Sequence, residues 1–555
     1  MKSMAIEKVE VPESEQTPLV RRLLEIIQEQ SELIDQLRAE IAHLKGISPK
    51  PKITPSKLEQ PPPSAPIPPA TGDGKRPGSA KRSKTAQLII HADEILKPDN
   101  VPEGSIFKGY EDFVVQDIII TPHNIRYRRE RWLTPDGLTI VASFPAKVLP
   151  GSHFGPELIC HILHQYHCNH VTQPSILEEL RQRGIDISAG QIDRILTQDK
   201  DAFHQEKDDL LPAGLESSPC IHVDDTVARH ESKLGYCTHI GNEFFAYFQS
   251  TPSKSRVNFL EVLRGTHRDY VLDEVALDYF AEQKLPKTLR AALAAGPRHF
   301  ADKPAWEAHL TALGITGELH VRTATEGALL GSLISHGTSL DLVIMSDDAG
   351  QFAILVHILC WIHAERTLAR LIPFNELYRQ ALEKVRTEIW EFYARLKAYK
   401  KEPTEEIKIA LEAEFDRLFS QETNFTTING ALRRLAANKA ELLLVLARPE
   451  LPLHNNLSEG DIREYVKRRK ISGGTRSDQG KRCRDTFASL KKTCRKLGIG
   501  FWDYLCDRVR GLGQIPPLGQ IVRERAKAAE AARVKAVEAA KGTETAKAAK
   551  TLVPA

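Results

Sequence analysis

Apolar residues recur along residues 20–44 with the alternating three- and four-residue spacing that is typical of a coiled coil. Seven of the eight seam positions are apolar, and the eighth, Gln30, would set the register of the pairing. The pattern predicts a coiled-coil helix within residues 1–46. The alternative is an amphipathic helix packed on its own domain, which the following proline-rich stretch disfavours. The seam residues are Val20, Leu23, Ile27, Gln30, Ile34, Leu37, Ile41 and Leu44.

Residues 47–88 have the composition of a linker. Nine prolines fall between residues 49 and 69, which is typical of an extended, polyproline-like segment. The stretch GKRPGSAKRSKT follows, and its basic residues include Lys81 and Arg82. A flexible basic arm of this kind would follow a nucleic-acid backbone, and the alternative is a solvated linker.

Residues 89–150 favour strands. Runs of β-branched and aromatic residues cover 113–121, 124–134 and 138–146, separated by Pro-His-Asn and Pro-Asp-Gly turns. We expect a small β-rich domain here. Four arginines in the middle run would either contact DNA or protect an exposed edge strand by their charge.

Residues 151–212 change to a helical pattern. Gly184 ends one predicted helix and Ser188 is a suitable N-cap for the next. Helices joined by a short, glycine-containing turn indicate a helix-turn-helix that contacts DNA, although helical hairpins without DNA are also common. The predicted helices cover residues 155–167, 174–184 and 188–198.

The rest of the chain mixes buried strands with long helical stretches. Three short apolar runs between residues 218 and 251 predict an antiparallel meander, and residues 339–348 predict a buried strand that ends in acid. Residues 257–338 and 353–450 are largely helical in pattern, and a further helix covers 453–470. The pattern as a whole predicts an α/β catalytic core with helical insertions.

Composition excludes several classes of protein. Of the 555 residues, 41% are hydrophobic and 27% charged, as in ordinary globular proteins. No run of ~18 apolar residues predicts a membrane span, and the first residues lack the apolar core of a signal peptide. Eight scattered cysteines show no framework spacing and indicate reduced thiols, so we expect a cytoplasmic protein.

Three acidic positions suggest chemistry. Asp224 and Asp347 each open an Asp-Asp pair at the end of an apolar strand, and Glu459 lies near the start of a helix. Acids in such places are costly unless something holds them, and carboxylates suit Mg²⁺ or Mn²⁺. Two such ions would support an in-line phosphoryl displacement. The alternative is that these acids are turn and N-cap residues.

Positive charge is concentrated directly after Glu459. Residues 461–500 hold thirteen basic and four acidic residues, a net charge of +9, whereas the whole chain has a net charge of +3. Glycines in the loop SGGTRSDQG would let the backbone approach a phosphate. The alternative is a solvated basic helix. The predicted DNA-binding residues here are Arg463, Lys467, Arg469, Lys470 and Arg476, in addition to Lys81 and Arg82 of the basic arm.

These motifs resemble the IS66-type insertion-sequence transposases, which are DDE enzymes with an RNase H-like core. Asp224-Asp225-Thr226 resembles the family's Asp-Glu-Thr signature, and the segment Asp347–Phe352 resembles its Asp-Gly-Tyr-Ala-Gly-Tyr. Cys360–Arg366 is similar to Cys-Trp-Ala-His-Ala-Arg-Arg. The signature Asn-Asn-x-x-Glu-x-x-x-Arg is matched by residues 455–463, and an Arg-Lys pair follows at residues 469–470.

The resemblance implies a transposase that nicks transposon ends and transfers the freed 3′-OH into target DNA. Asp224, Asp347 and Glu459 would be catalytic and would bind the two metal ions. The partners implied are terminal-repeat and target DNA, a second copy through the coiled coil, and small accessory proteins of the element. The setting implied is the bacterial cytoplasm, at the nucleoid when DNA is bound.

Two other functions remain open: a degenerate transposase that serves as a DNA-binding regulator, and an RNase H-like nuclease without strand transfer. We expect no zinc, because residues 86–150 lack cysteine and so lack the paired Cys-x-x-Cys motifs of many relatives. Cys360 and His363 are two ligands, too few for a structural zinc site, so we expect them to pack or to orient a helix.

With this resemblance the predicted domains extend along the whole chain. They are 1–46 coiled coil, 47–88 linker, 89–150 β-rich domain, 151–212 helix-turn-helix, 213–372 first part of the core with an insertion at 266–335, 373–450 helical insertion, 451–515 second part of the core, and 516–555 Ala/Lys-rich tail.

Overall fold

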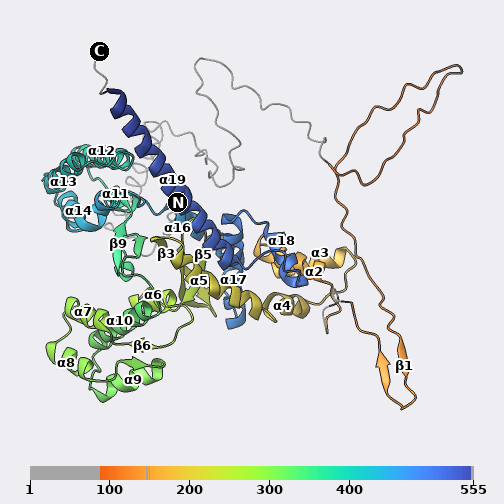
Figure 1. Cartoon of the computed structure of the whole chain (residues 1–555), viewed down its shortest axis with the longest axis horizontal. Helices are drawn as coiled ribbons and strands as arrows, with labels where there is room; N and C mark the ends of the chain where they lie inside the picture. The colour runs from red at the N-terminus through yellow and green to blue at the C-terminus, as the bar shows by residue number, and fades with distance from the viewer. Residues whose placement is uncertain (1–87, 146–147, 149–150, 552–555) are drawn as a thin grey trace, which may run out of the picture. The chain divides into compact units, whose positions relative to one another are not determined.

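The computed structural model of the chain describes residues 88–145, 148 and 151–551, with side chains as far as residue 535 (Figure 1). The chain divides into two units, residues 1–118 and residues 119–555. The predicted coiled coil, the proline-rich linker and the basic arm with Lys81 and Arg82 lie outside the described residues. All the helices and strands described below belong to the second unit.

A five-stranded mixed sheet organises the second unit, in the order β5-β4-β3-β8-β9. β3, β4 and β5 pair antiparallel as a meander, whereas β8 pairs parallel with β3, and β9 pairs parallel with β8. The meander expected between residues 218 and 251 and the strand expected before Asp347 are confirmed, as is the α/β class. The strands are β3 (Cys220–His230), β4 (Lys233–Gly241), β5 (Ala246–Thr251), β8 (Val343–Ser346) and β9 (Val356–Leu359).

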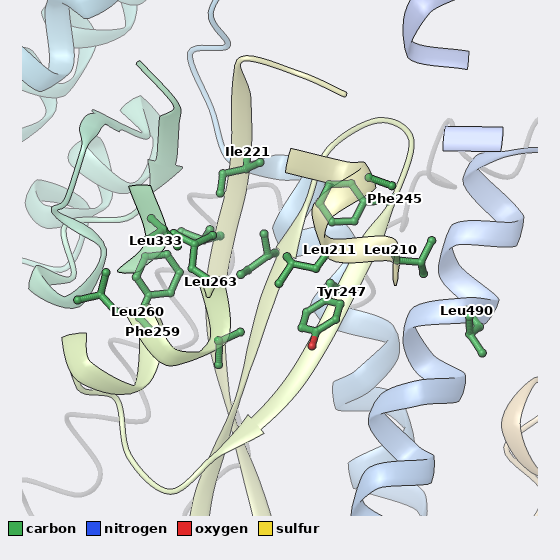
Figure 2. Close-up of a cluster of buried hydrophobic side chains, with 14 of the residues drawn as sticks. Leu210, Leu211, Ile221, Phe245, Tyr247, Phe259, Leu260, Leu263, Leu333 and Leu490 are labelled. Carbon is green, nitrogen blue, oxygen red and sulfur yellow. The ribbon is translucent and has the colours of Figure 1, made fainter. Parts of the chain in front are cut away.

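The helices that cover one face of the sheet are α5 (Asp201–Glu216), α6 (Arg256–Leu263) and α10 (Glu318–Ser335). Side chains alternate along a strand, so Ile221 and Val223 of β3 both point to this face. They are completely buried in one hydrophobic cluster with Phe259 of α6 and Leu333 of α10 (Figure 2). This cluster is the main core of the unit.

The helices at the opposite face are α11 (Trp361–Ala369), α15 (Lys439–Ala447) and α16 (Asn456–Ser472). Ile462 and Tyr465 of α16 pack with Cys237 of β4 and Phe248 of β5. The helix predicted for residues 453–470 is therefore confirmed, with its first helical residue at Asn456. This packing lays α16 along β3 and β4.

Helix α17 (Asp478–Lys496) closes the free edge of strand β5. Three of its polar side chains, spaced four residues apart and so on one helical face, accept hydrogen bonds from three backbone N–H groups of β5. An edge strand would otherwise present these groups to another chain. The pairs are Ala246 N to Thr493 Oγ1 (3.1 Å), Phe248 N to Ser489 Oγ (2.9 Å) and Ser250 N to Asp485 Oδ2 (2.7 Å).

Two helical segments interrupt the strand order, as the sequence predicted. The first, between α6 and β8, contains α7 (Glu274–Glu282), α8 (Lys287–Ala295), α9 (Lys303–Ala312), α10 and the short hairpin β6 (Tyr270–Val271) and β7 (His299–Phe300). The second contains α12 (Glu376–Tyr399), α13 (Glu405–Ser420) and α14 (Thr426–Ala437). The second segment has its own core around Phe392 and Phe415. Strand β9 is an exception within the stretch predicted to be helical.

Residues 151–200 fold into the three predicted helices, which are α2 (Pro156–His167), α3 (Gln173–Gln182) and α4 (Ala189–Thr197). Gly184 ends the turn after α3 with a φ of 79°, a conformation that glycine adopts without strain. Ser188 caps α4 by accepting a hydrogen bond from the Gln191 N–H at 3.2 Å. The helices and the cap are confirmed, and DNA contact by this segment stays a prediction.

The strands predicted for residues 89–150 are mostly wrong. Residues 113–121 form no strand, and the later runs yield only β1 (Arg131–Leu133) and β2 (Thr139–Val141), which pair with each other and are exposed throughout. β-branched residues favour a pleated, half-buried surface, but strand formation also needs neighbours to pack against. Two strands of three residues bury no hydrophobic face, so no β-rich core forms in the described residues.

The C-terminal segment is helical. α18 (Phe501–Arg510) packs on α2, and α19 (Leu518–Thr551) begins with Leu518 and Val522, both fully buried. The tail was expected to be a marginal helix or disordered, and it forms a helix whose first turns join the core. None of the helices among the described residues combines the length and apolar character needed to cross a membrane.

Candidate active site

Asp224 and Asp347 occupy equivalent positions on adjacent strands. β3 and β8 run parallel and His222 pairs with Met345, so two residues further along Asp224 is level with Asp347, the first residue after β8. Neighbouring strands lie ~4.8 Å apart. Because side chains alternate along a strand, Asp224 shares the face of His222, which is the face beneath α16. The register therefore places two acidic residues side by side at this face.

The Asp224 carboxyl is destabilised in its charged form. Its pKa is raised to about 7, first by burial and then by the charges of Asp347 and Asp225, against the lowering effect of a hydrogen bond from the Asp225 N–H. That hydrogen bond is 2.7 Å long. Lys254 is a nearby cation that lowers the pKa, and its effect is the weakest of these. Neighbouring acids with so little compensation provide a setting that a divalent cation would stabilise.

The second aspartate of each pair binds elsewhere. Asp225 accepts hydrogen bonds from Thr238 Oγ1 at 2.6 Å and from Gln351 Nε2 at 3.0 Å, on the opposite face of the sheet. Asp348 accepts one from Arg434 Nε of α14 at 2.9 Å. In both pairs the second carboxylate binds side chains of other elements, whereas the first accepts only a local backbone hydrogen bond, from Asp225 N–H to Asp224 and from Ala349 N–H to Asp347.

Asn455, the residue before α16, fixes the start of that helix on the sheet. It is buried, and its Nδ2 donates to the Val223 carbonyl at 2.8 Å while its Oδ1 lies 2.9 Å from His222 Nδ1. Its backbone N–H donates to Cys360 Sγ at 3.2 Å. One side chain and one N–H thus tie the first turn of α16 to β3 and to the start of α11.

Glu459 lies in that first turn and is held by residues of α11. Its Oε1 accepts a hydrogen bond from Arg366 Nη1 at 3.0 Å and lies 3.4 Å from His363 Nε2. Its Oε2 lies 3.5 Å from Nη2 of Arg463, one turn further along α16. The Glu459 side chain is 15% exposed, so solvent reaches it only in part.

The three carboxylates are neighbours without forming one closed cluster. His363 contacts Glu459, and its pKa, which burial lowers, is raised by the charges of both Glu459 and Asp347. Among the described residues, however, the carboxylate oxygens of Asp224, Asp347 and Glu459 are not a set that all lie within 4.8 Å of one another. Oxygen donors alone suit Mg²⁺ or Mn²⁺, so the residues present fit such an ion once Glu459 releases Arg366.

The basic residues after Glu459 fall into two groups, and this corrects the simple picture of a cationic stripe. Arg463, Lys467, Lys470 and Arg476 are exposed, as a surface for phosphate requires. Arg469 is half-buried and donates to Thr226 Oγ1 at 3.1 Å. The other group is buried and consists of Arg468, Lys491 and Lys492, together with the nearly buried side chain of Lys496.

The buried lysines neutralise Asp461, two residues after Glu459. Asp461 lies 2.7 Å from Lys496 Nζ, 3.2 Å from Lys492 Nζ and 3.1 Å from His239 Nε2. Burial would raise the pKa of Asp461, but the hydrogen bond with His239 and the two lysines hold it well below its usual range. These cations therefore serve the packing of α16 on α17, which the sequence analysis missed.

Sequence reasoning also missed the direct contacts of His363 and Arg366 with Glu459. Both belong to the segment Cys360–Arg366, and their spacing of three residues puts them on one face of a helix. His363 was expected to pack or to orient a helix, and it lies beside a candidate catalytic acid instead. Glu365, where relatives have arginine, is buried and pairs with Arg386 at 2.5 Å.

Comparison with known proteins gives two matches. Residues 336–483 match the family model described as "Transposase IS66 family", a segment that includes Asp347, Glu459 and most of the basic residues. An uncharacterized protein, y4jO, of Sinorhizobium fredii (strain NBRC 101917 / NGR234) is 44% identical over 321 residues. The alignment covers 57% of this chain and 100% of that relative.

Proposed function

Because the chain belongs to the IS66 family of transposases, we propose that it nicks the ends of its element and joins them to target DNA through metal-dependent phosphoryl transfer. In the first step water bonds to phosphorus while the P–O3′ bond breaks, which leaves a 3′-hydroxyl and a 5′-phosphate. In the second step that 3′ oxygen bonds to a target phosphorus and displaces the target's 3′ oxygen. The number of phosphodiester bonds is unchanged in the second step.

Asp224, Asp347 and Glu459 are the proposed metal ligands. Two divalent ions, when bound, would supply activation of the attacking oxygen and stabilisation of the leaving oxygen. Glu459 exchanges its contact with Arg366 for this role, while His363 stays beside the carboxylate. Asp225 and Asp348 hold the surrounding loops through their own hydrogen bonds and take no part in the chemistry.

The exposed basic residues of α16 and of the following loop would position the DNA. Arg463 and Lys467 follow Glu459 at successive turns of one helical face, so a phosphate backbone along that face would reach the candidate acids. Contacts of this kind orient the nucleic acid without reading its sequence. Lys470, Arg476 and Arg469 complete the proposed set, with Arg469 releasing part of its contact with strand β3.

Recognition of the element's ends would come from the helices α2 to α4, in the manner of a helix-turn-helix. The mixed sheet, with Asp224 within β3 and Asp347 directly after the parallel strand β8, supports an RNase H-like core. Pairing of two protomers through the N-terminal heptad would bring two DNA ends into one complex.

The observation that carries the proposal is the register of β3 and β8. It sets Asp224 level with Asp347 beneath the first turn of α16, where Glu459 lies. Both aspartates come first in their pairs, and both second aspartates bind elsewhere. An arrangement that served folding alone would place cations beside Asp224 and Asp347 as well, as it does beside Asp461.

Cleavage of labelled DNA carrying the element's own ends tests the proposal. The purified full-length chain is incubated with Mg²⁺ or Mn²⁺, and the variants Asp224→Asn, Asp347→Asn and Glu459→Gln are compared singly. Each loses at least about a thousandfold in nicking rate, because each removes a ligand of the ions that stabilise the transition state. Asp348→Asn, next to Asp347 in sequence, is the matched control and retains its activity.

The products discriminate between the alternatives. Joined donor and target strands support a transposase, whereas nicked ends without joining indicate a nuclease. Binding of end DNA without cleavage in either metal indicates a regulator and overturns the proposal. Full activity in any one of the three variants removes that residue from the catalytic set.

A further inference from the structure

Two histidines and an aspartate meet where the first helical insertion joins the sheet. His267 and Asp269 follow α6, and His336 caps the C-terminus of α10. One ligand atom from each lies within 4.8 Å of the other two, and no other group of three His, Cys, Asp or Glu among the described residues meets this criterion. The residues are far apart in sequence and belong to neither strand end of the candidate active site.

The distances between these side chains are compatible with ligands of one shared ion. His336 Nε2 lies 3.0 Å from both carboxylate oxygens of Asp269. A fourth candidate, His299 of β7, has its Nε2 3.3 Å from Asp269 Oδ2. Ligand atoms at ~2.0–2.1 Å from a tetrahedral zinc ion lie ~3.3 Å from one another. Ser332 Oγ donates to Asp269 Oδ1 at 2.9 Å, which orients the carboxylate as an outer partner does in metal sites.

The chemistry of the set favours a transition metal over Mg²⁺. The imidazoles of His267 and His336 are stacked, with centroids 3.5 Å apart and planes at 12°, so one ring must turn before both nitrogen lone pairs point at one ion. Two imidazolium cations would repel each other in this arrangement, and Arg264 adds a positive charge nearby. Neutral imidazoles with one carboxylate are the donors of zinc and of non-haem iron, whereas Mg²⁺ takes oxygen ligands.

We propose that His267, Asp269 and His336 bind a divalent transition-metal ion, with Zn²⁺ as the best-suited ion. The sequence analysis expected no zinc, because it searched for cysteine pairs. Side chains of His267 and His336 are exposed, so the ion has access from solvent, and Asp269 is half-buried beneath them.

The position of the site gives the ion a structural role. His267 lies just after α6, which packs on the sheet, and His336 lies shortly before β8, which carries Asp347 at its end. An ion that joins these two points closes the loop formed by the whole insertion, and metal clips that close long loops give large entropic stabilisation. The inference is independent of the proposed reaction.

Metal binding to the full-length chain tests this inference. The protein is purified without a polyhistidine tag, stripped with a chelator and titrated with Co²⁺ in the presence of excess Mg²⁺, which occupies oxygen-only sites. We expect one Co²⁺ per chain with visible absorption bands, displaced by Zn²⁺, and a rise in melting temperature on Zn²⁺ addition. His267→Ala and His336→Ala weaken binding by at least the ~10–100-fold that loss of an outer partner causes.

His320→Ala is the matched control, since His320 lies on α10 outside the cluster, and it binds Co²⁺ as the parent does. His267→Ala removes an exposed ring, so retained far-ultraviolet circular dichroism separates a lost ligand from a lost fold. If the parent chain binds no more Co²⁺ than the double variant His267→Ala/His336→Ala, the cluster is a hydrogen-bonded group only, and the proposal is overturned. Unchanged affinity in both single variants has the same consequence.

Discussion

Two acids of helix α16, Glu459 and Asp461, are two residues apart in sequence and lie in different electrostatic surroundings. Asp461 is buried among His239, Lys492 and Lys496, and its charge is fully compensated. Glu459 is partly exposed and adjoins the Asp224 and Asp347 side of the sheet, where acids outnumber cations. Both acids have cationic partners, but those of Asp461 are buried with it, whereas Arg366 and Arg463 beside Glu459 are 41% and 78% exposed. Exposed partners can be exchanged for a metal ion, and buried partners mark an acid that serves packing.

The largest effect on unfolding free energy is expected from removing the charge of Asp461. Asp461→Asn leaves the buried Lys496 without its ion-pair partner and Lys492 with Glu464 alone, which costs about 3–5 kcal/mol of unfolding free energy. Chemical denaturation monitored by circular dichroism measures this loss. Asp478→Asn is the control, because Asp478 is 83% exposed and solvent screens its ion pair with Lys481. Equal effects in the two variants would remove the distinction drawn here.

Removing the charge of Asp224 is expected to have a smaller effect on unfolding free energy, and in the opposite direction. The pKa of Asp224 is about 7 in the folded chain and 3.8 as an isolated side chain, so ionisation in metal-free protein costs stability as pH rises from about 4 to 7. Asp224→Asn removes this cost. The variant is therefore more stable than the parent at pH 8, by on the order of 1–3 kcal/mol.

The measurement is unfolding free energy against pH in the presence of a chelator. The gap between the variant and the parent closes toward pH 4, where Asp224 is protonated in the folded chain in any case. Addition of Mg²⁺ stabilises the parent above pH 7 and leaves the variant unaffected, because metal binding requires the ionised carboxylate. A variant less stable than the parent at pH 8 would mean that the Asp224 charge is already compensated.

The smallest effect concerns Arg366, which holds Glu459. Its side chain is 41% exposed, so Arg366→Gln changes unfolding free energy by only about 0–1 kcal/mol. If Arg366 competes with the ion for Glu459, the same change tightens Mg²⁺ binding by about two- to fivefold, measured by calorimetry. Arg463→Gln serves as the comparison, since Arg463 lies further from Glu459 and is 78% exposed. Weaker Mg²⁺ binding in Arg366→Gln would show that Arg366 supports the site.

Apolar runs such as Cys220–Val223 and Val343–Ser346 correctly predicted buried strands, and Asp347 follows the end of β8 as expected. The expected strand end at Asp224 is wrong, because β3 continues to His230 and Asp224 lies within it. The sequence also predicted the start of α16 near Glu459 and the cap at Ser188, since caps and helical periodicity are local. Residues 113–121 show the limit of local reasoning, because β propensity became a strand only where a neighbour offered a face to pack against.

The sequence predicted the candidate site only in part, for a related reason. Lys491, Lys492 and Lys496 look like DNA-binding residues until α17 is placed against α16, which turns Lys492 and Lys496 toward Asp461 and Lys491 toward Glu464. Charge along the chain does not specify which side chains meet. The motif that contains His363 and Arg366 was visible, but their contact with Glu459 depends on the packing of α11 beside α16.

The most direct test of the central claim is the anomalous scattering of Mn²⁺ in crystals of the full-length chain. The account predicts two peaks ~3.5–4 Å apart, bounded by the carboxylates of Asp224, Asp347 and Glu459, with Glu459 released from Arg366. No peak beside Asp224 of β3 and Asp347 after β8, with Glu459 still bound to Arg366 under saturating Mn²⁺, would contradict it.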